Sequence, residues 1–261
     1  MNGFKQRNKD LYEGLVFDTR FNGKLEIVEY ITNKQVLVRF LETGYTTKTT
    51  LIGIQEGEVK DKLRRSVFGV GITGEEPTCL NGRDLREYMV WTGVLERCYC
   101  NKAQSTKYKT YKGCSMSENF KYYPYFKEWC NKQIGFDQEG WALDKDILVK
   151  GNKIYSEEVC VFVPQKINNL ILTNKAKRGK YPIGVAFDKR NSKFRSCINR
   201  YGKHVHLGHY HTPHEAFLAY KKAKEYYIKE VVTSYRDQID PRVYEALMVW
   251  EVEEDRTDCE Y

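Results

Sequence analysis

The sequence predicts an α+β protein built from several small domains. Three observations lead to this prediction: short strand-like runs fill residues 8–74, apolar residues with helical spacing appear in residues 80–172, and residues 181–232 have the pattern of three strands followed by a helix. A chain of 261 residues is long enough for two or three modest domains. We expect residues 233–261 to form a helical segment and an acidic tail.

Residues 8–74 have the pattern of a small all-β domain. Runs rich in β-branched and aromatic residues alternate with Gly- and Asn-containing turns, and these runs are Leu25–Tyr30, Gln35–Phe40 and Tyr45–Leu51. In the second run apolar residues occupy neighbouring positions, so we expect this strand to be buried on more than one side. The glycine-rich residues 68–74 lack the Gly-Lys-Ser/Thr ending of a phosphate-binding loop, so we expect a close-packed strand and turn there.

Charge is unevenly distributed along the chain. The formal net charge is +8, but the last eleven residues carry six acids and one Arg, which leaves a strongly basic remainder. Residues 173–211 contain ten Lys and Arg against one acid, Asp188, and all five His lie in residues 204–214. This composition is typical of a protein that binds nucleic-acid phosphates, although a solvated basic surface with no partner would have the same composition.

The clearest local pattern lies in residues 181–232. We expect strands at Ile183–Phe187, Lys193–Asn199 and His204–His209, joined by short turns. A helix should follow, because Thr212 is a good N-cap, Pro213 suits the first helical position and Glu215 completes a capping box.

Alternation along these strands predicts a sheet with two different faces. One face should pack against the helix through Phe194, Ser196, Ile198, Val205 and Leu207. The other should be polar, basic and open, as a surface that enters the major groove of double-stranded DNA must be. The candidate DNA-binding residues on it and beside it are Arg190, Lys193, Arg195, Asn199, Arg200, Lys203, His204 and His206.

This segment resembles the plant ethylene-response-factor (apetala-two) DNA-binding domain, forms of which occur in phage and homing endonucleases. The residues that carry the resemblance are Ile183–Val185, Lys193–Ile198, Val205–Tyr210, Thr212–Ala216, Ala219 and Tyr220. The resemblance implies that the sheet reads the major groove. Several Arg and Trp residues that plant members use for base contacts are missing, so the preferred DNA sequence stays open.

The middle segment resembles the HNH (His-Me finger) domains of phage homing endonucleases. The residues that carry this resemblance are Trp91, Arg97–Tyr99, Tyr108, Tyr111, Cys114, Phe126, Trp129, Leu143–Asp146, Gly151, Asn152, Tyr155, Ser156, Cys160 and Phe162–Asn168. It implies a central ββα-metal finger at residues 143–168, in which a strand, a loop, a second strand and a helix follow one another. It also implies that the N-terminal β domain is a small barrel-like domain.

The HNH resemblance implies metal-dependent hydrolysis of a DNA phosphodiester. Asp144 and Asn168 would then bind Mg²⁺ or Mn²⁺ through oxygen atoms. The residue after the metal-binding Asp should be the His that activates water, but this position holds Lys145, and no His occurs in residues 1–203. Lys145, Asp146 and Asn152 are the candidate catalytic residues, although neither a Lys with a pKa of about 10.4 nor an acidic Asp is an efficient base at neutral pH.

Two functional alternatives therefore follow from the sequence. The first is an HNH-type homing endonuclease that the C-terminal sheet directs to its site on DNA. The second is a catalytically inactive DNA-binding protein with the same parts, acting as a repressor or as a factor that interacts with a host. Binding of structured RNA is a weaker third interpretation, because the sheet lacks the aromatic motif of RNA-binding sheets.

The remaining composition sets further expectations. The chain has eight Cys, no Cys-x-x-Cys pair and no signal-peptide core, so we expect reduced thiols and a cytoplasmic protein, in the host cell if it is encoded by a phage. A structural Zn²⁺ site formed by Cys98, Cys100, Cys114 and Cys130 is an alternative to simple burial of these side chains. We expect no membrane span and no organic cofactor, and a monomer is plausible.

Overall fold

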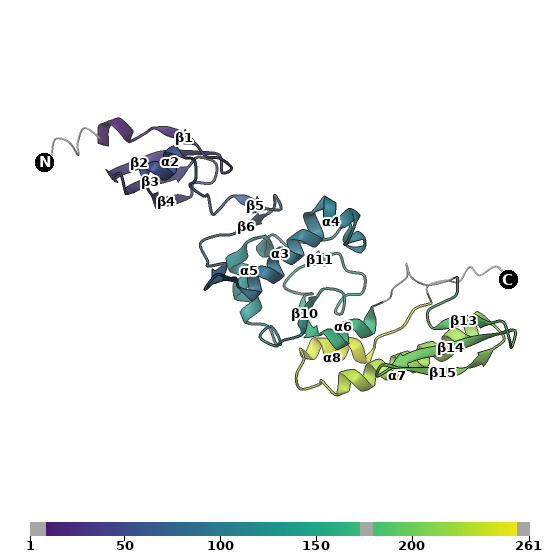
Figure 1. Cartoon of the computed structure of the whole chain (residues 1–261). Coiled ribbons are helices and arrows are strands. Elements are labelled where there is room, and N and C mark those ends of the chain that lie inside the picture. Colours follow the sequence, from purple (N-terminus) through teal and green to yellow (C-terminus); the bar gives the residue numbers. More distant parts are fainter. Residues whose placement is uncertain (1–8, 173–179, 255–261) are drawn as a thin grey trace. The chain divides into compact units, whose positions relative to one another are not determined.

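The computed structural model describes residues 9–172 and 180–254 (Figure 1). The chain forms two compact units, residues 1–130 and residues 131–261, and this division falls inside the range 80–172 predicted as one domain. Helices mix with several small sheets, which confirms the predicted α and β content. Most of the acidic tail lies outside the described residues, as do Lys175, Lys177 and Arg178 of the basic segment.

The first unit begins with a four-stranded antiparallel sheet in the order β1-β2-β3-β4. Its strands are β1 (Val16–Asp18), β2 (Lys24–Thr32), β3 (Gln35–Phe40) and β4 (Thr46–Thr49), and helix α2 (Leu51–Gln55) follows. Leu25 and Ile27 from β2 are fully buried and share one core with Leu51 and Ile54 from α2. The expected small β domain is therefore present, but within the described residues its sheet does not close into a barrel.

Two expectations about this sheet are wrong. Strand β3 is fully buried on one face only: Val36, Val38 and Phe40 are 0%, 0% and 1% exposed, whereas on the other face Leu37 is half-buried and Gln35 and Arg39 are exposed, because the core lies on a single side of the sheet. The third predicted strand also stops early. The hydroxyl of Thr50 accepts a hydrogen bond from the backbone N–H of Gly53 at 3.1 Å, which caps α2 and turns Leu51 into a helical residue.

The rest of the first unit is built around aromatic side chains. Its elements are β5 (Arg65–Val67), β6 (Gly71–Ile72), β7 (Cys79–Leu80), β8 (Arg83–Asp84), α3 (Arg86–Tyr99), α4 (Asn101–Ser105), η1 (Lys109–Tyr111), β9 (Ser115–Met116), η2 (Asn119–Lys121) and α5 (Tyr123–Asn131). The buried Trp91 donates its indole N–H to the carbonyl oxygen of Phe120 at 2.8 Å. A Cβ on Gly71 would lie 2.6 Å from Leu95 and 2.9 Å from Trp91, which confirms the close packing predicted for residues 68–74.

The second unit contains a hairpin with a helix and a separate sheet with a long helix. The first part comprises β10 (Trp141–Asp144), β11 (Ile154–Tyr155), β12 (Val161–Pro164) and α6 (Gln165–Ile171), and β10 pairs antiparallel with β12. The second part comprises β13 (Val185–Asp188), β14 (Lys193–Arg200), β15 (Lys203–Tyr210), α7 (Pro213–Thr233) and α8 (Pro241–Met248). The sheet is antiparallel with the order β13-β14-β15, and the predicted strand–strand–strand–helix arrangement is therefore present.

One core joins both parts of the second unit. Val161 and Ile167, from the hairpin and its helix, belong to the same buried cluster as Ile198 from β14, Phe217 from α7 and Leu247 from α8. Because α6, α7 and α8 share this core, the hairpin–helix part and the sheet form one compact body (Figure 1).

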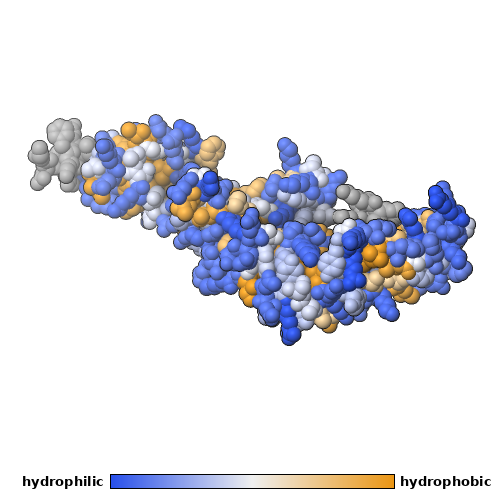
Figure 2. Space-filling model, turned by 60° about the horizontal axis from the view of Figure 1, so that its bottom comes forward, coloured by the Kyte–Doolittle hydropathy of each residue, from blue (hydrophilic) through white to orange (hydrophobic). Residues whose placement is uncertain are grey.

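The visible surface is mainly hydrophilic, and its hydrophobic residues form small separate groups (Figure 2). In the part of the chain that the structure describes, no helix combines the length and the apolar character that a membrane span requires.

Candidate nucleic-acid interface and finger

The three-stranded sheet has one covered face and one open face. Ser196 and Ile198 of β14 are 0% and 4% exposed on the face covered by α7. Arg195 and Asn199, which alternate with them, are exposed on the opposite face. Asn199 pairs with His204 across β14 and β15, so these two side chains share the open face.

A β-bulge changes the alternation in β15. Cys197 pairs with His206 but Ser196 pairs with Gly208, so Leu207 is the extra residue of the bulge. Beyond the bulge the pattern is reversed, and His209 lies opposite Arg195 on the open face. The simple alternation of residues along β15 does not predict this position of His209. The glycine at 208, within the strand and with a φ of +138°, is the sequence feature that indicates the bulge.

His209 is hydrogen-bonded to an acidic residue at the edge of the open face. Its Nε2 lies 3.0 Å from Oδ2 of Asp188, the residue that ends β13. The hydrogen bond from His209 lowers the pKa of the Asp188 carboxyl, and the backbone N–H of Arg190 contributes in the same direction. The His206 ring lies 4.7 Å from the His209 ring, and its Nδ1 is 3.7 Å from Sγ of Cys197. Asp188 and His209 are thus members of this face that sequence reasoning missed.

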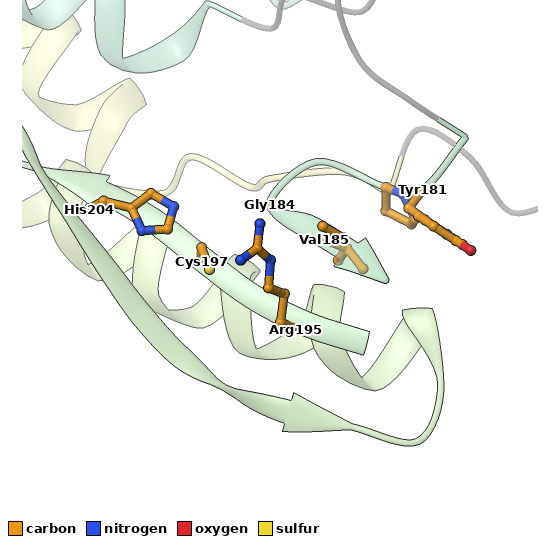
Figure 3. A pocket seen from close by; sticks show the side chains of 8 residues that line it. Tyr181, Gly184, Val185, Arg195, Cys197 and His204 are labelled. Carbon is orange, nitrogen blue, oxygen red and sulfur yellow. The ribbon is translucent and has the colours of Figure 1, made fainter. Parts of the chain in front are cut away.

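A shallow pocket of about 240 Å³ opens on the same face (Figure 3). It is lined by Tyr181, Pro182, Gly184, Val185, Ala186, Arg195, Cys197 and His204. In Figure 3 the guanidinium group of Arg195 extends over the sheet toward Gly184, beside Cys197. The face therefore offers a cationic donor next to small apolar side chains.

Not every predicted DNA-binding residue belongs to this face. Lys193 and Lys203 are the first residues of β14 and β15, and Arg190 lies in the turn between β13 and β14; Arg190 and Lys203 are exposed. Arg200, in contrast, forms an ion pair with Glu230 of α7. Its guanidinium carbon also lies 5.6 Å from the centre of the Tyr226 ring, so Arg200 contacts the helix and not the open face.

The predicted finger places Asp144 at the end of β10. Oδ1 of Asp144 accepts hydrogen bonds from the backbone N–H groups of Asp146 at 2.7 Å and Ile147 at 2.8 Å. Burial raises the pKa of the Asp144 carboxyl, and these two hydrogen bonds oppose the rise. Among the described residues, the second carboxylate oxygen of Asp144 accepts no hydrogen bond, so it is the atom that could bind a cation.

Lys145 is buried and forms a dense set of contacts. The residue is 5% exposed, and its Nζ lies 2.7 Å from each carboxylate oxygen of Asp146 and 2.5 Å from the carbonyl oxygen of Asn152. The amide of Asn152 donates in return to the carbonyl oxygens of Lys145 at 2.9 Å and Ile154 at 2.6 Å. The structure therefore brings all three candidate catalytic residues together beside Asp144.

The other proposed metal ligands lie on α6 and in the first unit. Asn168 is half-buried on α6, and no hydrogen bond joins it to Asp144 in the described part of the chain. Cys98, Cys114 and Cys130 are buried and Cys100 is half-buried. Among the residues that the structure describes, no three His, Cys, Asp or Glu side chains are arranged to hold a metal ion.

Comparisons of the chain with protein-family models, with curated proteins and with solved structures gave no match.

Proposed function

We propose that this chain binds double-stranded DNA through the open face of the β13–β14–β15 sheet. The observation that carries the proposal is the separation of the two faces: α7 covers the apolar one, and the other presents Arg195, Asn199 and His204 to solvent. A polar face on neighbouring antiparallel strands suits the major groove, which admits a β-ribbon.

Each group on this face has a chemical role that the proposal assigns. Arg195 can donate two hydrogen bonds to guanine O6 and N7, and Asn199 can pair with adenine N6 and N7. Lys193 and Lys203, at the strand ends, would bind phosphates and position the sheet without reading bases. The resemblance to ethylene-response-factor domains agrees with these roles. The His209–Asp188 pair would fix the ring of His209 in one orientation.

The test compares two arginines of the same strand. Arg195→Ala should weaken binding to a selected DNA site by about 1–3 kcal/mol and relax the preference at one or two bases. Arg200→Ala removes the same group from the helix-facing side, so it should lower protein stability and leave the base preference intact. Selection of sites from a random duplex library, followed by affinity measurements, checks both. Unchanged base preference in Arg195→Ala would show that this face is not the reader.

A second candidate function is metal-dependent cleavage of DNA by the finger. The observation that favours it is the β10–loop–β12–α6 arrangement, with the buried Asp144 at the end of the first strand. Oδ2 of Asp144, which accepts no hydrogen bond from the described residues, suits a hard cation, and Asn168 would supply a second oxygen ligand. A bound Mg²⁺ would stabilise the charge that develops on the phosphate and on the leaving oxygen. Lys145, which is buried and already binds Asp146, would contribute positive charge near the phosphate without binding it directly.

Plasmid nicking tests this second candidate directly. Wild-type protein should convert supercoiled plasmid to the open-circular form in Mg²⁺ or Mn²⁺, and Asp144→Ala should not. Absence of nicking by a wild-type preparation that binds DNA would leave the catalytically inactive DNA-binding protein as the function. Equal nicking by wild type and Asp144→Ala would exclude this finger as the nuclease.

A further inference from the structure

The first unit contains a second strongly basic segment. Residues 97–117 include five cations and no acid: Arg97, Lys102, Lys107, Lys109 and Lys112. The acids that bracket the segment along the chain are Glu96 and Glu118. This run of charge is separate from the sheet of the second unit and plays no part in the function proposed above.

The segment folds into a compact knob. Helix α4 and the 3₁₀ turn η1 pack together, and the backbone N–H of Tyr108 donates to the carbonyl oxygen of Ala103 at 2.8 Å. The side chain of Gln104 donates to the carbonyl oxygens of Arg97 and Cys98, at 2.9 and 2.7 Å, and so ties the knob to α3. We call residues 101–113 the lysine knob.

The four lysines of the knob have no acidic partners. Lys102, Lys107, Lys109 and Lys112 are all exposed, and none of them forms an ion pair within the described part of the chain. Elsewhere in the unit, most arginines are matched with glutamates, as Arg39 is with Glu26 at 2.8 Å. The knob is therefore a local concentration of unneutralised positive charge, which attracts polyanions.

Two tyrosines indicate which kind of polyanion fits. The rings of Tyr108 and Tyr111 pack edge to face with centres 5.8 Å apart, and Nζ of Lys107 lies 4.6 Å from the centre of the Tyr108 ring. The guanidinium carbon of Arg97 lies 5.8 Å from the Tyr111 ring centre. Because these contacts engage the rings within the knob, the rings are poor platforms for stacking unpaired bases, as proteins that bind single strands require.

We infer that the lysine knob is a second DNA-binding surface, which binds the phosphate backbone of duplex DNA without reading its sequence. The inference rests on the proposed function, because the polyanion it names is the duplex that the sheet reads. When two surfaces of one chain bind the same duplex, the affinity of the whole chain for that duplex rises, since the second contact forms within one complex. The knob adds affinity, and the sheet supplies preference among sequences.

The experiment removes the charge of the knob and of a matched set. One variant changes Lys102, Lys107, Lys109 and Lys112 to Gln. The control changes Lys34, Lys48, Lys60 and Lys62, which are exposed lysines of the same unit, to Gln. Binding of both variants to a duplex of random sequence and to a selected site is measured between about 50 and 200 mM salt, where each phosphate contact contributes about −0.9 to the slope of log K against log salt.

The knob variant should bind both duplexes more weakly, with a slope shallower by about 3–4 if all four contacts are lost. Its base preference should equal that of wild type, and the control should keep the wild-type slope. A third variant with Arg at the four knob positions should bind as wild type does, which separates charge from any effect on folding.

The outcomes distinguish the inference from the proposed function. A wild-type slope in the knob variant overturns the inference and leaves DNA reading by the sheet intact. Loss of affinity in the knob variant, together with unchanged preference in Arg195→Ala, supports the knob and contradicts the sheet. If the knob variant binds a structured RNA more weakly but binds duplex DNA as tightly as wild type does, the inference is overturned. A wild-type protein that binds neither duplex also overturns it.

Discussion

The ammonium nitrogen of Lys145 lies 2.7 Å from each carboxylate oxygen of Asp146 and 2.5 Å from the carbonyl oxygen of Asn152. An ammonium group has three N–H donors, and these acceptors engage all of them. The group therefore links the end of β10 to the loop that precedes β11. A general base needs a lone pair directed at its substrate, and the contacts of Lys145 match a structural cross-link better than a base.

The first prediction concerns the stability that this cross-link provides. Lys145→Met keeps most of the apolar part of the side chain but removes the ammonium group, which leaves the carbonyl oxygen of Asn152 without its donor and Asp146 without its partner. We expect the free energy of unfolding to fall by about 2–3 kcal/mol, less than the roughly 3–5 kcal/mol of a fully buried pair, because the Asp146 side chain is 42% exposed.

Urea unfolding checks this value, and Lys189→Met is the matched control. Lys189 is exposed, so its substitution should change the free energy of unfolding by less than about 0.5 kcal/mol. Equal stabilities of the two variants would contradict a structural role for Lys145.

The second prediction uses two glycines of the second unit. Gly184 has a φ of +80°, and a Cβ there would overlap the ring of Tyr220 from α7. Gly202, in the turn between β14 and β15, has a φ of +75° and no atom within 4 Å of such a Cβ. Gly202→Ala should cost about 1 kcal/mol from backbone strain alone, and Gly184→Ala about 3 kcal/mol or more because the ring must also move.

Thermal unfolding of the two variants measures the difference. If they lose equal stability, the close approach of Gly184 to Tyr220 does not hold α7 against the sheet. If Gly184→Ala weakens DNA binding and Gly202→Ala does not, the pocket that Gly184 lines belongs to the interface.

Features that depend on residues close together in the sequence were predictable from it. The capping box of α7 is present: the Thr212 hydroxyl accepts from the backbone N–H of Glu215 at 3.2 Å, and the Glu215 carboxylate accepts from the backbone N–H of Thr212 at 3.2 Å. Both bonds join residues three apart, so local spacing determines them. The helical spacing of apolar residues noted within residues 80–172 likewise corresponds to a helix, α3, which buries Trp91, Val94 and Leu95.

Features that depend on distant residues were not predictable. The position of His209 depends on the register between β14 and β15, where a single extra residue, Leu207, reverses the alternation. Arg200 follows the basic pattern of its segment, but Glu230, thirty residues away on α7, binds its side chain. The burial of Lys145 likewise depends on the loop that carries Asn152, which no spacing rule predicts.

The third prediction is a pH dependence at the start of α8. Burial alone would raise the pKa of Asp240, but the hydrogen bonds and the charge of Arg242 outweigh it and hold the pKa below its usual range. Asp240 also caps the helix, since Oδ1 accepts from the backbone N–H of Arg242 at 2.9 Å. A lowered pKa gives stability that is fully present above the unfolded value of about 3.9 and is lost as the pH falls through the folded value.

Asp240→Asn keeps the cap and removes the charge. It should therefore cost about 0.5–1 kcal/mol at pH 7 and nearly nothing at an acidic pH low enough to protonate the wild-type carboxyl. Asp240→Ala should cost more at both pH values, because it removes the cap as well. Urea unfolding at the two pH values checks this, and an Asp240→Asn penalty that is independent of pH would contradict it.

The last prediction addresses the residue that replaces the expected His. The Lys145 ammonium is bound to Asp146 and Asn152, so a neutral amine there would have to give up contacts that hold the loop. An imidazole titrates near neutral pH and loses its proton without that cost. We therefore expect Lys145→His to nick plasmid in Mg²⁺ faster than wild type, with a rate that rises between about pH 6 and 8, and Asp144→Ala in the same background to abolish nicking. If Lys145 instead binds phosphate as a cation, Lys145→Arg keeps the wild-type rate and Lys145→His gains nothing. Strong wild-type cleavage that Lys145→Ala leaves unchanged would contradict both roles, because the base would then be Asp146 or water held by the metal ion.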